Sequence, residues 1–394
     1  MAKALKQGIG FLMENSVFLI FGTAAALFFA NLDPHFYHEL IELEIAPHIN
    51  FHFIVNDILM CFFFALAAKE IWEALLPGGA LSSVKKAATP LMATAGGIVG
   101  PVILYMAGVI SFDAPELTRG WAIPCATDIA FSYLVARMVF GKGHPAIPFL
   151  LLLAIADDAA GLIILAVAYP QGEMHLITFF VSVVGAILFN VFVLNKWLKV
   201  SNFWMYLIIA GPLAWYGFFM GGIHPALALV PIIPTIPTKS GDHGFFEGTK
   251  DEEQHDPLNK FEHWWKNPVE LILMLFGFTN AGVAFGAMGL ATGLITTGLL
   301  LGKPLGIVLL TIIALKVFKL ELPAGMNFRD LVVVGFMAGI GFTVALFVAT
   351  VAFPAGDILD AAKMGALFSF FAAVLSFIVA WILRVGRYGS VNNS

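Results

Sequence analysis

Two adjacent carboxylates, Asp157 and Asp158, lie near the middle of an apolar run from Ala146 to Tyr169. A carboxylate at the centre of a membrane helix costs about 2.5–3.5 kcal/mol on insertion scales, so an acid at this depth indicates a functional site. Asp128 and Lys303 lie at similar depth in other apolar runs. Together the four groups predict a site where a small cation and protons compete for the same oxygen atoms.

The side chains around this pair predict how the cation is held. Adjacent residues on a helix point about 100° apart, so we expect one aspartate to face Asp128 and the other to meet Lys303. Burial disfavours the charged form of each group whereas ion pairing favours it, so the cluster can exchange protons in the physiological range. Sodium and lithium prefer oxygen ligands, which the carboxylates, the Thr127 hydroxyl and backbone carbonyls supply. The alternative is an Asp157–Lys303 ion pair that merely pins two helices.

Two apolar runs carry residues that interrupt a helix at membrane depth. In the first, Pro124 removes a backbone donor shortly before Thr127 and Asp128. The second brings together Gly335, Gly339, Gly341 and Thr343. Paired interruptions are typical of transporter sites, because the ends of half-helices offer partial charges to an ion. Close helix packing is the alternative explanation for any one of these glycines, but it does not account for Asp128.

The composition indicates an integral membrane protein. Only 12% of the 394 residues are charged, 60% are hydrophobic and the mean hydropathy is +0.90, whereas a soluble domain has about 25% charged residues. No basic patch indicates a nucleic-acid partner. Cys61 and Cys125 lie inside apolar segments and offer neither a disulfide framework nor zinc-type spacing. We therefore expect no cofactor and no nucleic-acid partner.

The apolar runs predict an all-α fold. A span needs about 20 apolar residues, and about twelve candidate spans are present. They are Phe11–Ala30, Ile54–Leu76, Ala87–Gly108, Trp121–Phe140, Ala146–Tyr169, His175–Leu194, Phe203–Met220, the short Ile223–Ile236, Pro268–Gly286, Leu290–Leu315, Leu331–Phe353 and Leu359–Leu383. We expect residues 1–394 to form one transmembrane transporter unit, with a charged cytoplasmic loop at 239–266 between two halves.

The basic residues predict the orientation of these spans. Of the 21 Lys and Arg residues, all but Arg119, Lys303 and Lys363 fall on one side, which predicts that both termini are cytoplasmic. The first run could instead be a signal peptide, but its removal would spoil this alternation. The external segment Asn31–Phe53 lacks Lys and Arg, and we expect a short helix or hairpin there. Metal binding is the alternative, because the segment contains His35, His38, His48 and His52.

Five motifs resemble those of the NhaA-type sodium/proton antiporters. They are Thr127–Phe131, Ala154–Asp158, Phe278–Val283, Gly302–Gly306 and Gly339–Thr343. They follow in order at equivalent spans, and the similarity covers about Val17 to Leu383. Because that family has inverted repeats and discontinuous helices, the resemblance implies inverted repeats and two broken, crossing helices in this chain.

The resemblance also implies roles for the membrane charges. Asp157 and Asp158 would form the central ion- and proton-binding pair and hold the transported Na⁺, with Thr127 nearby. Asp128 would compensate charge at the helix crossing, and Lys303 would pair with Asp157. The implied activity is electrogenic exchange of cytoplasmic Na⁺ or Li⁺ for external protons by alternating access. The implied setting is a homodimer in the lipid bilayer of a bacterial inner membrane.

A second set of residues matches positions that the family uses in sensing pH or near its outer face. They are Glu70, Glu262, His263 and His224, and Asp57 matches a further membrane carboxylate. Where the family commonly has two basic residues and an acid after Glu70, this chain has Ile71-Trp72-Glu73-Ala74, and Pro225-Ala226 follows His224. Our default account of the pH dependence is therefore competition between sodium and protons for one site.

Three other functions fit the sequence less well. An intramembrane aspartyl protease needs a Gly-x-Gly-Asp pattern, and neither Gly241-Asp242 nor Gly356-Asp357 has the first glycine, so we expect no enzyme. A sodium-coupled symporter for an organic solute needs a polar pocket, and apart from Thr279 and Asn280 the mid-membrane positions offer little beyond the ion cluster. A passive channel is disfavoured because no pore loop is evident.

Overall fold

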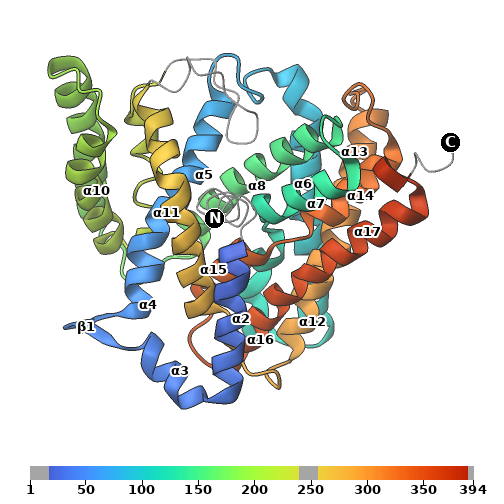
Figure 1. Ribbon diagram of the computed structural model, residues 1–394, viewed down its shortest axis with the longest axis horizontal. Coiled ribbons are helices and arrows are strands. Elements are labelled where there is room, and N and C mark those ends of the chain that lie inside the picture. Colours follow the sequence, from blue (N-terminus) through green and yellow to red (C-terminus); the bar gives the residue numbers. More distant parts are fainter. Residues whose placement is uncertain (1–16, 239–255, 389–394) are drawn as a thin grey trace, which may run out of the picture. The chain divides into compact units, whose positions relative to one another are not determined.

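The computed structural model describes residues 17–238 and 256–388, and these residues are mostly helical (Figure 1). They divide into two compact units, each assembled from separate stretches of the chain. Unit 1 contains residues 84–161 and 280–388, and unit 2 contains residues 17–83, 162–238 and 256–279. Of the predicted cytoplasmic loop, residues 239–255 lie outside the described part.

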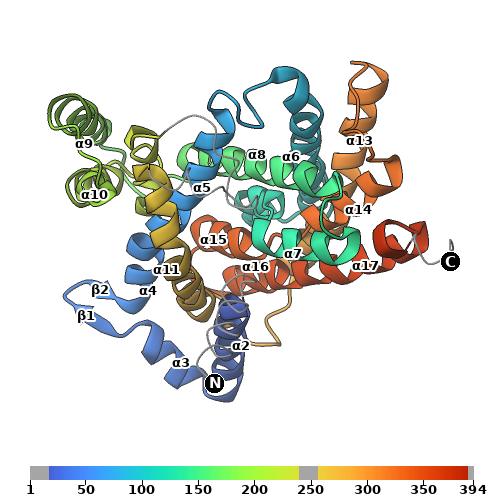
Figure 2. The same cartoon turned by 45° about the horizontal axis from the view of Figure 1, so that its top comes forward.

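The first stretch of unit 2 contains both a short helix and a hairpin, where the sequence predicted one or the other (Figure 2). The elements are α2 (Val17–Leu32), α3 (Pro34–Ile41), β1 (Glu44–Ala46), β2 (Ile49–Asn50), α4 (Phe51–Phe53), the π-helix η1 (Ile54–Leu59) and α5 (Met60–Leu75). Asp33 begins α3 by accepting a hydrogen bond from the Phe36 amide at 3.0 Å. Among the described residues, no group of histidines is arranged to hold a metal, and the one suitable group consists of glutamates.

The second stretch of unit 2 departs from the predicted spans in two places. Its elements are α9 (Leu176–Leu188), the π-helix η3 (Phe189–Trp197), α10 (Phe203–Met220), the 3₁₀ turns η4 (Pro225–Leu227) and η5 (Ile233–Thr235), and α11 (Pro257–Asn280). The expected helix at Ile223–Ile236 is wrong, because prolines at 225, 231, 234 and 237 remove the amides that a continuous helix needs. Glu262 and His263 were expected in a loop, but α11 begins at Pro257 and contains both.

Unit 1 contains the two broken spans. Its elements are α6 (Val84–Ser111), the 3₁₀ helix η2 (Pro115–Cys125), α7 (Ile129–Phe140), the start of α8 (Ala146–Ala168), α12 (Leu290–Thr297), the π-helix η7 (Gly298–Gly302), α13 (Lys303–Lys316), α14 (Phe328–Ala338), α15 (Phe342–Ala352), α16 (Asp357–Leu367), η8 (Phe368–Phe370), α17 (Phe371–Leu383) and η9 (Gly386–Tyr388). The chain bends by 51° between η2 and α7 and by 46° between α14 and α15. The two predicted interruptions are therefore present.

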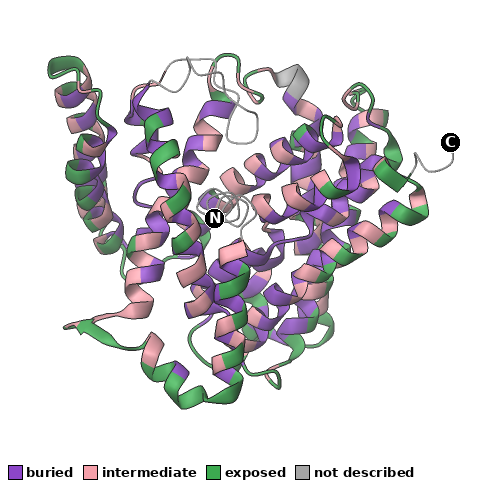
Figure 3. Cartoon of the chain, in the orientation of Figure 1, coloured by how far each residue is buried: buried purple, intermediate pink, exposed green. Residues whose placement is uncertain are grey.

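Seven described helices are long and apolar enough to cross a membrane, or nine if each bent pair is one span. The predicted count of about twelve is not reached, partly because Ile223–Ile236 is not a helix and α2 is short. Exposed side chains on α9 and α10 are largely apolar, as lipid contact requires; Ile177 is 83% exposed. In contrast, nearly every residue of α15 is buried (Figure 3).

Glycines allow α6 and α13 to pack with their backbones in contact. A Cβ atom added to Gly306 would lie 2.0 Å from the carbonyl oxygen of Gly96, and one added to Gly302 would lie 2.7 Å from the Cα of Pro101. Any larger residue at these positions would separate the two helices. This contact fixes the start of α13, where Lys303 is located.

Candidate functional site

Asp128 lies at the crossing of the two broken spans in unit 1. It is buried and begins α7, and its Oδ1 accepts a hydrogen bond from the Phe131 amide at 3.2 Å. Its Oδ2 accepts from the Thr343 amide at 3.2 Å and from the Thr343 hydroxyl. Thr343 is in the first turn of α15. One carboxylate therefore caps two helix N-termini, whose partial positive charges stabilise its negative charge.

Backbone carbonyl oxygens at or just after the C-terminal ends of η2 and α14 also accept hydrogen bonds. The Asp128 amide donates to the Ile340 carbonyl at 2.6 Å, which joins the two breaks through the backbone. The Thr127 hydroxyl lies 3.0 Å from the carbonyl oxygen of Ala338, the last residue of α14. The Lys303 ammonium donates to the carbonyl of Cys125, the last residue of η2. Positive charge thus meets the partial negative charge of a helix C-terminus.

Asp157 and Lys303 form a buried ion pair. Lys303 Nζ lies 2.6 Å from Asp157 Oδ2, and the lysine is 0% exposed. The same carboxylate oxygen lies 2.7 Å from the Thr127 hydroxyl. The structure therefore brings Asp157, Lys303 and Thr127 into one cluster. Such a pair is stable in a membrane interior only because the charges face each other and their remaining hydrogen bonds are satisfied.

Asp158 differs from its neighbour in having no such partner. It is half-buried, and within the described residues it accepts no hydrogen bond and forms no ion pair. Its charge nevertheless interacts with those of Asp157, Asp128 and Lys303. Three carboxylates and one ammonium therefore share this region, and the excess negative charge favours binding of a cation or of protons. Asp158 is the oxygen donor that is available for either.

A second cluster of charges lies in unit 2, where the family resemblance implied a pH response. The Lys69 ammonium lies 2.5 Å from Glu73 Oε2 and 3.7 Å from Glu70 Oε1, and it also forms an ion pair with Glu262. The three carboxylates are close enough together to hold a metal ion, but the lysine already supplies the cation between them. His263 is exposed on α11, and within the described residues it makes no hydrogen bond or ion pair.

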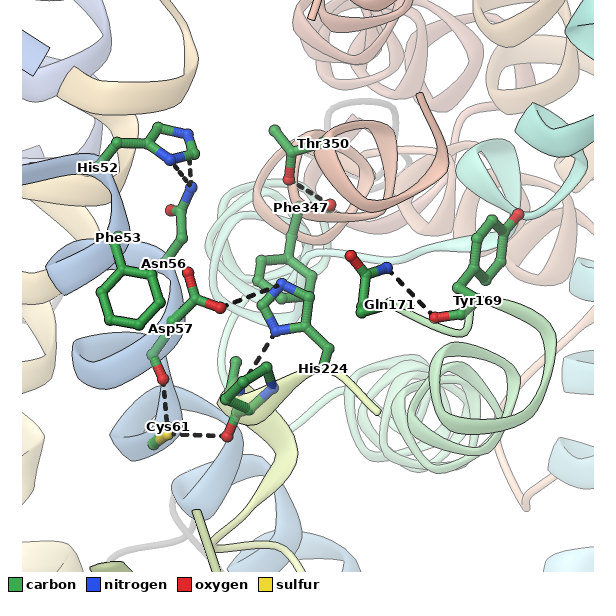
Figure 4. A network of polar contacts seen from close by, with 12 residues as sticks. His52, Phe53, Asn56, Asp57, Cys61, Tyr169, Gln171, His224, Phe347 and Thr350 are labelled. Atoms are coloured by element: carbon green, nitrogen blue, oxygen red, sulfur yellow. Dashed lines mark hydrogen bonds and ion pairs between the residues drawn. The ribbon is translucent and has the colours of Figure 1, made fainter. Parts of the chain in front are cut away.

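His224 and Asp57 face each other in unit 2 (Figure 4). His224 Nε2 lies 4.0 Å from Asp57 Oδ1, and His224 Nδ1 accepts a hydrogen bond from the Ala226 amide at 3.2 Å. Because Nδ1 is an acceptor, the neutral ring carries its proton on Nε2, toward the carboxylate.

Asp57 lies in the π-helical segment η1, whose wider turns leave its backbone carbonyl available to side chains. That carbonyl accepts from Trp215 Nε1 at 2.7 Å. It also accepts from Cys61 Sγ at 3.3 Å (Figure 4). On the other side, Asn56 Nδ2 lies 2.8 Å from His52 Nε2. The segment that carries Asp57 is therefore fixed by neighbours from both its own helix and α10.

Sequence reasoning did not assign roles to Lys69, to the Thr343 hydroxyl or to the Cys125 carbonyl. Lys69 precedes Glu70, whereas the family's basic residues follow that position. Lys69 therefore has no counterpart in the family motif. Thr343 was noted as part of an interrupted stretch, and its contact with Asp128 depends on a packing partner far away in sequence. The Cys125 carbonyl has no side-chain signature at all.

Comparisons with known proteins show which family this chain resembles. A family model described as Na⁺/H⁺ antiporter 1 matches residues 12–383. A Na⁺/H⁺ antiporter NhaA of Jannaschia sp. is 50% identical over 96% of this chain and 98% of its own length. One from Geobacter sulfurreducens is 46% identical over 97% and 100%, and one from Desulfitobacterium hafniense is 45% identical over 97% of both.

Among solved structures, the sodium proton antiporter MjNhaP1 from Methanocaldococcus jannaschii aligns over 98% of this chain and 100% of its own, with 15% identity and a TM-score of 0.49. The names of the sequence relatives describe transporters and not enzymes. They give no support to the alternative of a sodium-coupled symporter.

Proposed function

The chain belongs to the Na⁺/H⁺ antiporter 1 family, and from that membership we propose that it exchanges cytoplasmic Na⁺ or Li⁺ for external protons through Asp157 and Asp158. The observation that carries this proposal is the set of charged side chains at the helix crossing. Three carboxylates and one ammonium interact there, Lys303 pairs with Asp157, and Asp158 has no ion-pair or hydrogen-bond partner among the described residues. A site of this kind must take up a cation or protons.

Sodium and protons compete because they use the same oxygens. Na⁺ is held by Asp158 and Asp157, with the Thr127 hydroxyl close enough to contribute a third oxygen. When protons occupy the carboxylates the negative charge that attracts Na⁺ is lost, so sodium affinity falls as pH falls. If both carboxylates release protons for each Na⁺ bound, one net charge crosses the membrane per cycle and exchange is electrogenic.

Lys303 and Asp128 keep the empty and occupied sites electrically balanced. Lys303 neutralises Asp157 when neither sodium nor a proton occupies that carboxylate, and the ion competes with the ammonium for it. Asp128 stays at the crossing, because three hydrogen-bond donors from the N-termini of α7 and α15 converge on it. Alternating access then requires that the site open first to one side of the membrane and then to the other, while the helix crossing stays assembled.

The pH response is proposed to have two sources. Competition at the Asp157–Asp158 site lowers sodium affinity at low pH without any separate sensor. Glu70 and Glu262, which Lys69 holds together, and His224, which faces Asp57, are candidates to modify the maximal rate. His263 belongs to the proposed set by its place in the motif, and its exposure makes it the weakest member.

The setting follows from the same proposal. The protein works as one multi-pass transporter unit in a bacterial inner membrane, with both termini in the cytoplasm, about twelve spans and inverted repeats. It assembles as a homodimer, and its other partners are sodium, protons and the lipid bilayer. No resident cofactor takes part, because oxygens of the chain supply all the ligands that a hard monovalent cation prefers.

Proteoliposomes test both the exchange and its electrical character. Sodium added to acid-loaded vesicles without any organic solute should raise the internal pH, and the rate should respond to a membrane potential clamped with potassium and valinomycin. Dependence on an added solute would overturn the antiporter proposal. A rate that is insensitive to voltage would overturn the electrogenic stoichiometry while leaving exchange itself intact.

A further inference from the structure

Thr94 connects the helix that carries Asp157 to the helix that packs beside Lys303. It is a buried residue of α6. Its hydroxyl lies 3.0 Å from the Pro90 carbonyl of its own helix and 3.1 Å from the Leu153 carbonyl of α8. In an α-helix the carbonyl of Leu153 also accepts from the amide four residues later, which is that of Asp157. Thr94 therefore contacts the helical turn that bears the paired carboxylate.

The next turn of α6 contacts the helix that bears Lys303. A Cβ atom on Gly96 would lie 2.1 Å from the carbonyl oxygen of Gly306. A Cβ atom on Gly97 would lie 3.6 Å from Lys303 Cε and 3.3 Å from a side-chain carbon of Ile307. The aliphatic stem of Lys303 thus passes over Gly97. Within a single turn, α6 touches both helices that supply the ion pair.

We propose that Thr94 is a positioning residue for the Asp157–Lys303 pair: its hydroxyl holds the Asp157 turn of α8 at a fixed distance from the Lys303 turn of α13. The proposal rests on the function assigned above to that pair. A threonine in a helix satisfies its hydroxyl on the carbonyl four residues earlier, and Thr94 already has that acceptor. The hydroxyl has one proton, which Thr94 shares between this acceptor and the Leu153 carbonyl of α8, so the same group that bonds within α6 also locates the neighbouring helix.

The inference predicts an effect on ion affinity. Binding sites depend on positions held within about 0.5 Å. Without the bond to Leu153, the turn of α8 can move relative to Lys303 and Thr127, and the oxygens offered to sodium are less well placed. Loss of one hydrogen bond corresponds to a change of roughly three- to tenfold. We expect this change in the apparent KM for Na⁺, with the maximal rate within about twofold of the parent.

The chain provides a closely matched control. Thr311 of α13 is also buried, and its hydroxyl bonds to the Ile307 carbonyl of its own helix at 2.7 Å. In the described part of the chain it bonds to no other helix. Thr94→Val and Thr311→Val remove the same atoms from similar environments, and they differ in the bond between helices. Thr94→Ser keeps the hydroxyl and should restore the parental KM.

Sodium-dependent proton release from proteoliposomes, normalised to reconstituted protein, gives KM and maximal rate separately for each variant. The inference holds if Thr94→Val raises KM while Thr94→Ser and Thr311→Val do not. It is overturned if Thr94→Val leaves KM unchanged, or if Thr311→Val raises it equally. If Thr94→Val does not fold, Thr94→Ala decides, because it removes the same hydroxyl with a smaller side chain and should raise KM in the same way. Absence of exchange in the parent would instead refute the proposed function.

Discussion

Each unit contains a fully buried lysine that pairs with a carboxylate from another helix. The two clusters differ in whether a neighbouring carboxylate is left without an ion-pair partner. In unit 2, all three glutamates lie within ion-pair distance of Lys69. In unit 1, Lys303 donates hydrogen bonds to Asp157 and to a backbone carbonyl, and Asp158 has no partner among the described residues. A buried ion pair by itself is thus a poor marker of a transport site. The proposed ion site therefore rests on the unpaired acid beside the interrupted helices and not on the ion pair alone.

Removal of the Asp158 charge should have the largest effect on function. We expect Asp158→Asn to abolish sodium-dependent proton release, because an amide cannot carry a proton between the two sides and is a weaker ligand for Na⁺. Dye dequenching in everted vesicles measures the loss. Asp357→Asn is the control, since Asp357 is an exposed aspartate of unit 1. Normal exchange by Asp158→Asn would show that the unpaired acid of unit 1 is not the ion site.

Removal of the Lys69 charge should act mainly on stability. Lys69→Met leaves Glu70, Glu73 and Glu262 close together without a cation, and breaking a buried pair by removing one partner costs about 3–5 kcal/mol. We expect a clearly lower melting temperature of the purified protein in detergent, and partial recovery when Glu262→Gln is added. Lys260→Met is the control, because Lys260 is exposed on α11. An unchanged melting temperature would mean that the glutamates of unit 2 do not depend on Lys69.

The sequence predicted the Asp157–Lys303 contact in unit 1 but not the Lys69 cluster in unit 2, for a physical reason. Asp128, Asp157 and Lys303 stand alone among apolar residues, so the cost of burying them makes each one conspicuous before any contact is known. Lys69 stands next to a helix end that carries several charges, where a charged residue is ordinary. Its burial depends on Glu262, which α11 supplies from much later in the sequence. No local pattern contains that information.

The fold shows the same division between local and distant causes. Pro124 and the glycines before Thr343 predicted the two interruptions, because both act on the backbone where they stand. The helix expected at Ile223–Ile236 is absent, because the hydropathy of this segment indicates a span whereas its three prolines remove amides that a helix needs. The early start of α11 was missed because polar residues at 257–267 concealed the helix.

The smallest expected effect separates two neighbours on α11. Glu262 pairs with Lys69, whereas His263 is exposed and has no ion-pair partner among the described residues. We expect Glu262→Gln to displace the profile of maximal rate against pH by about one unit, the size of one lost charge interaction. His263→Ala should leave the profile unchanged. The profiles must be measured at saturating sodium, because competition at the Asp157–Asp158 site changes KM and cannot displace the maximal rate. Superimposable profiles for both variants would leave competition as the whole account of the pH response. A displacement by His263→Ala alone would assign the response to the exposed histidine and exclude the Lys69 cluster.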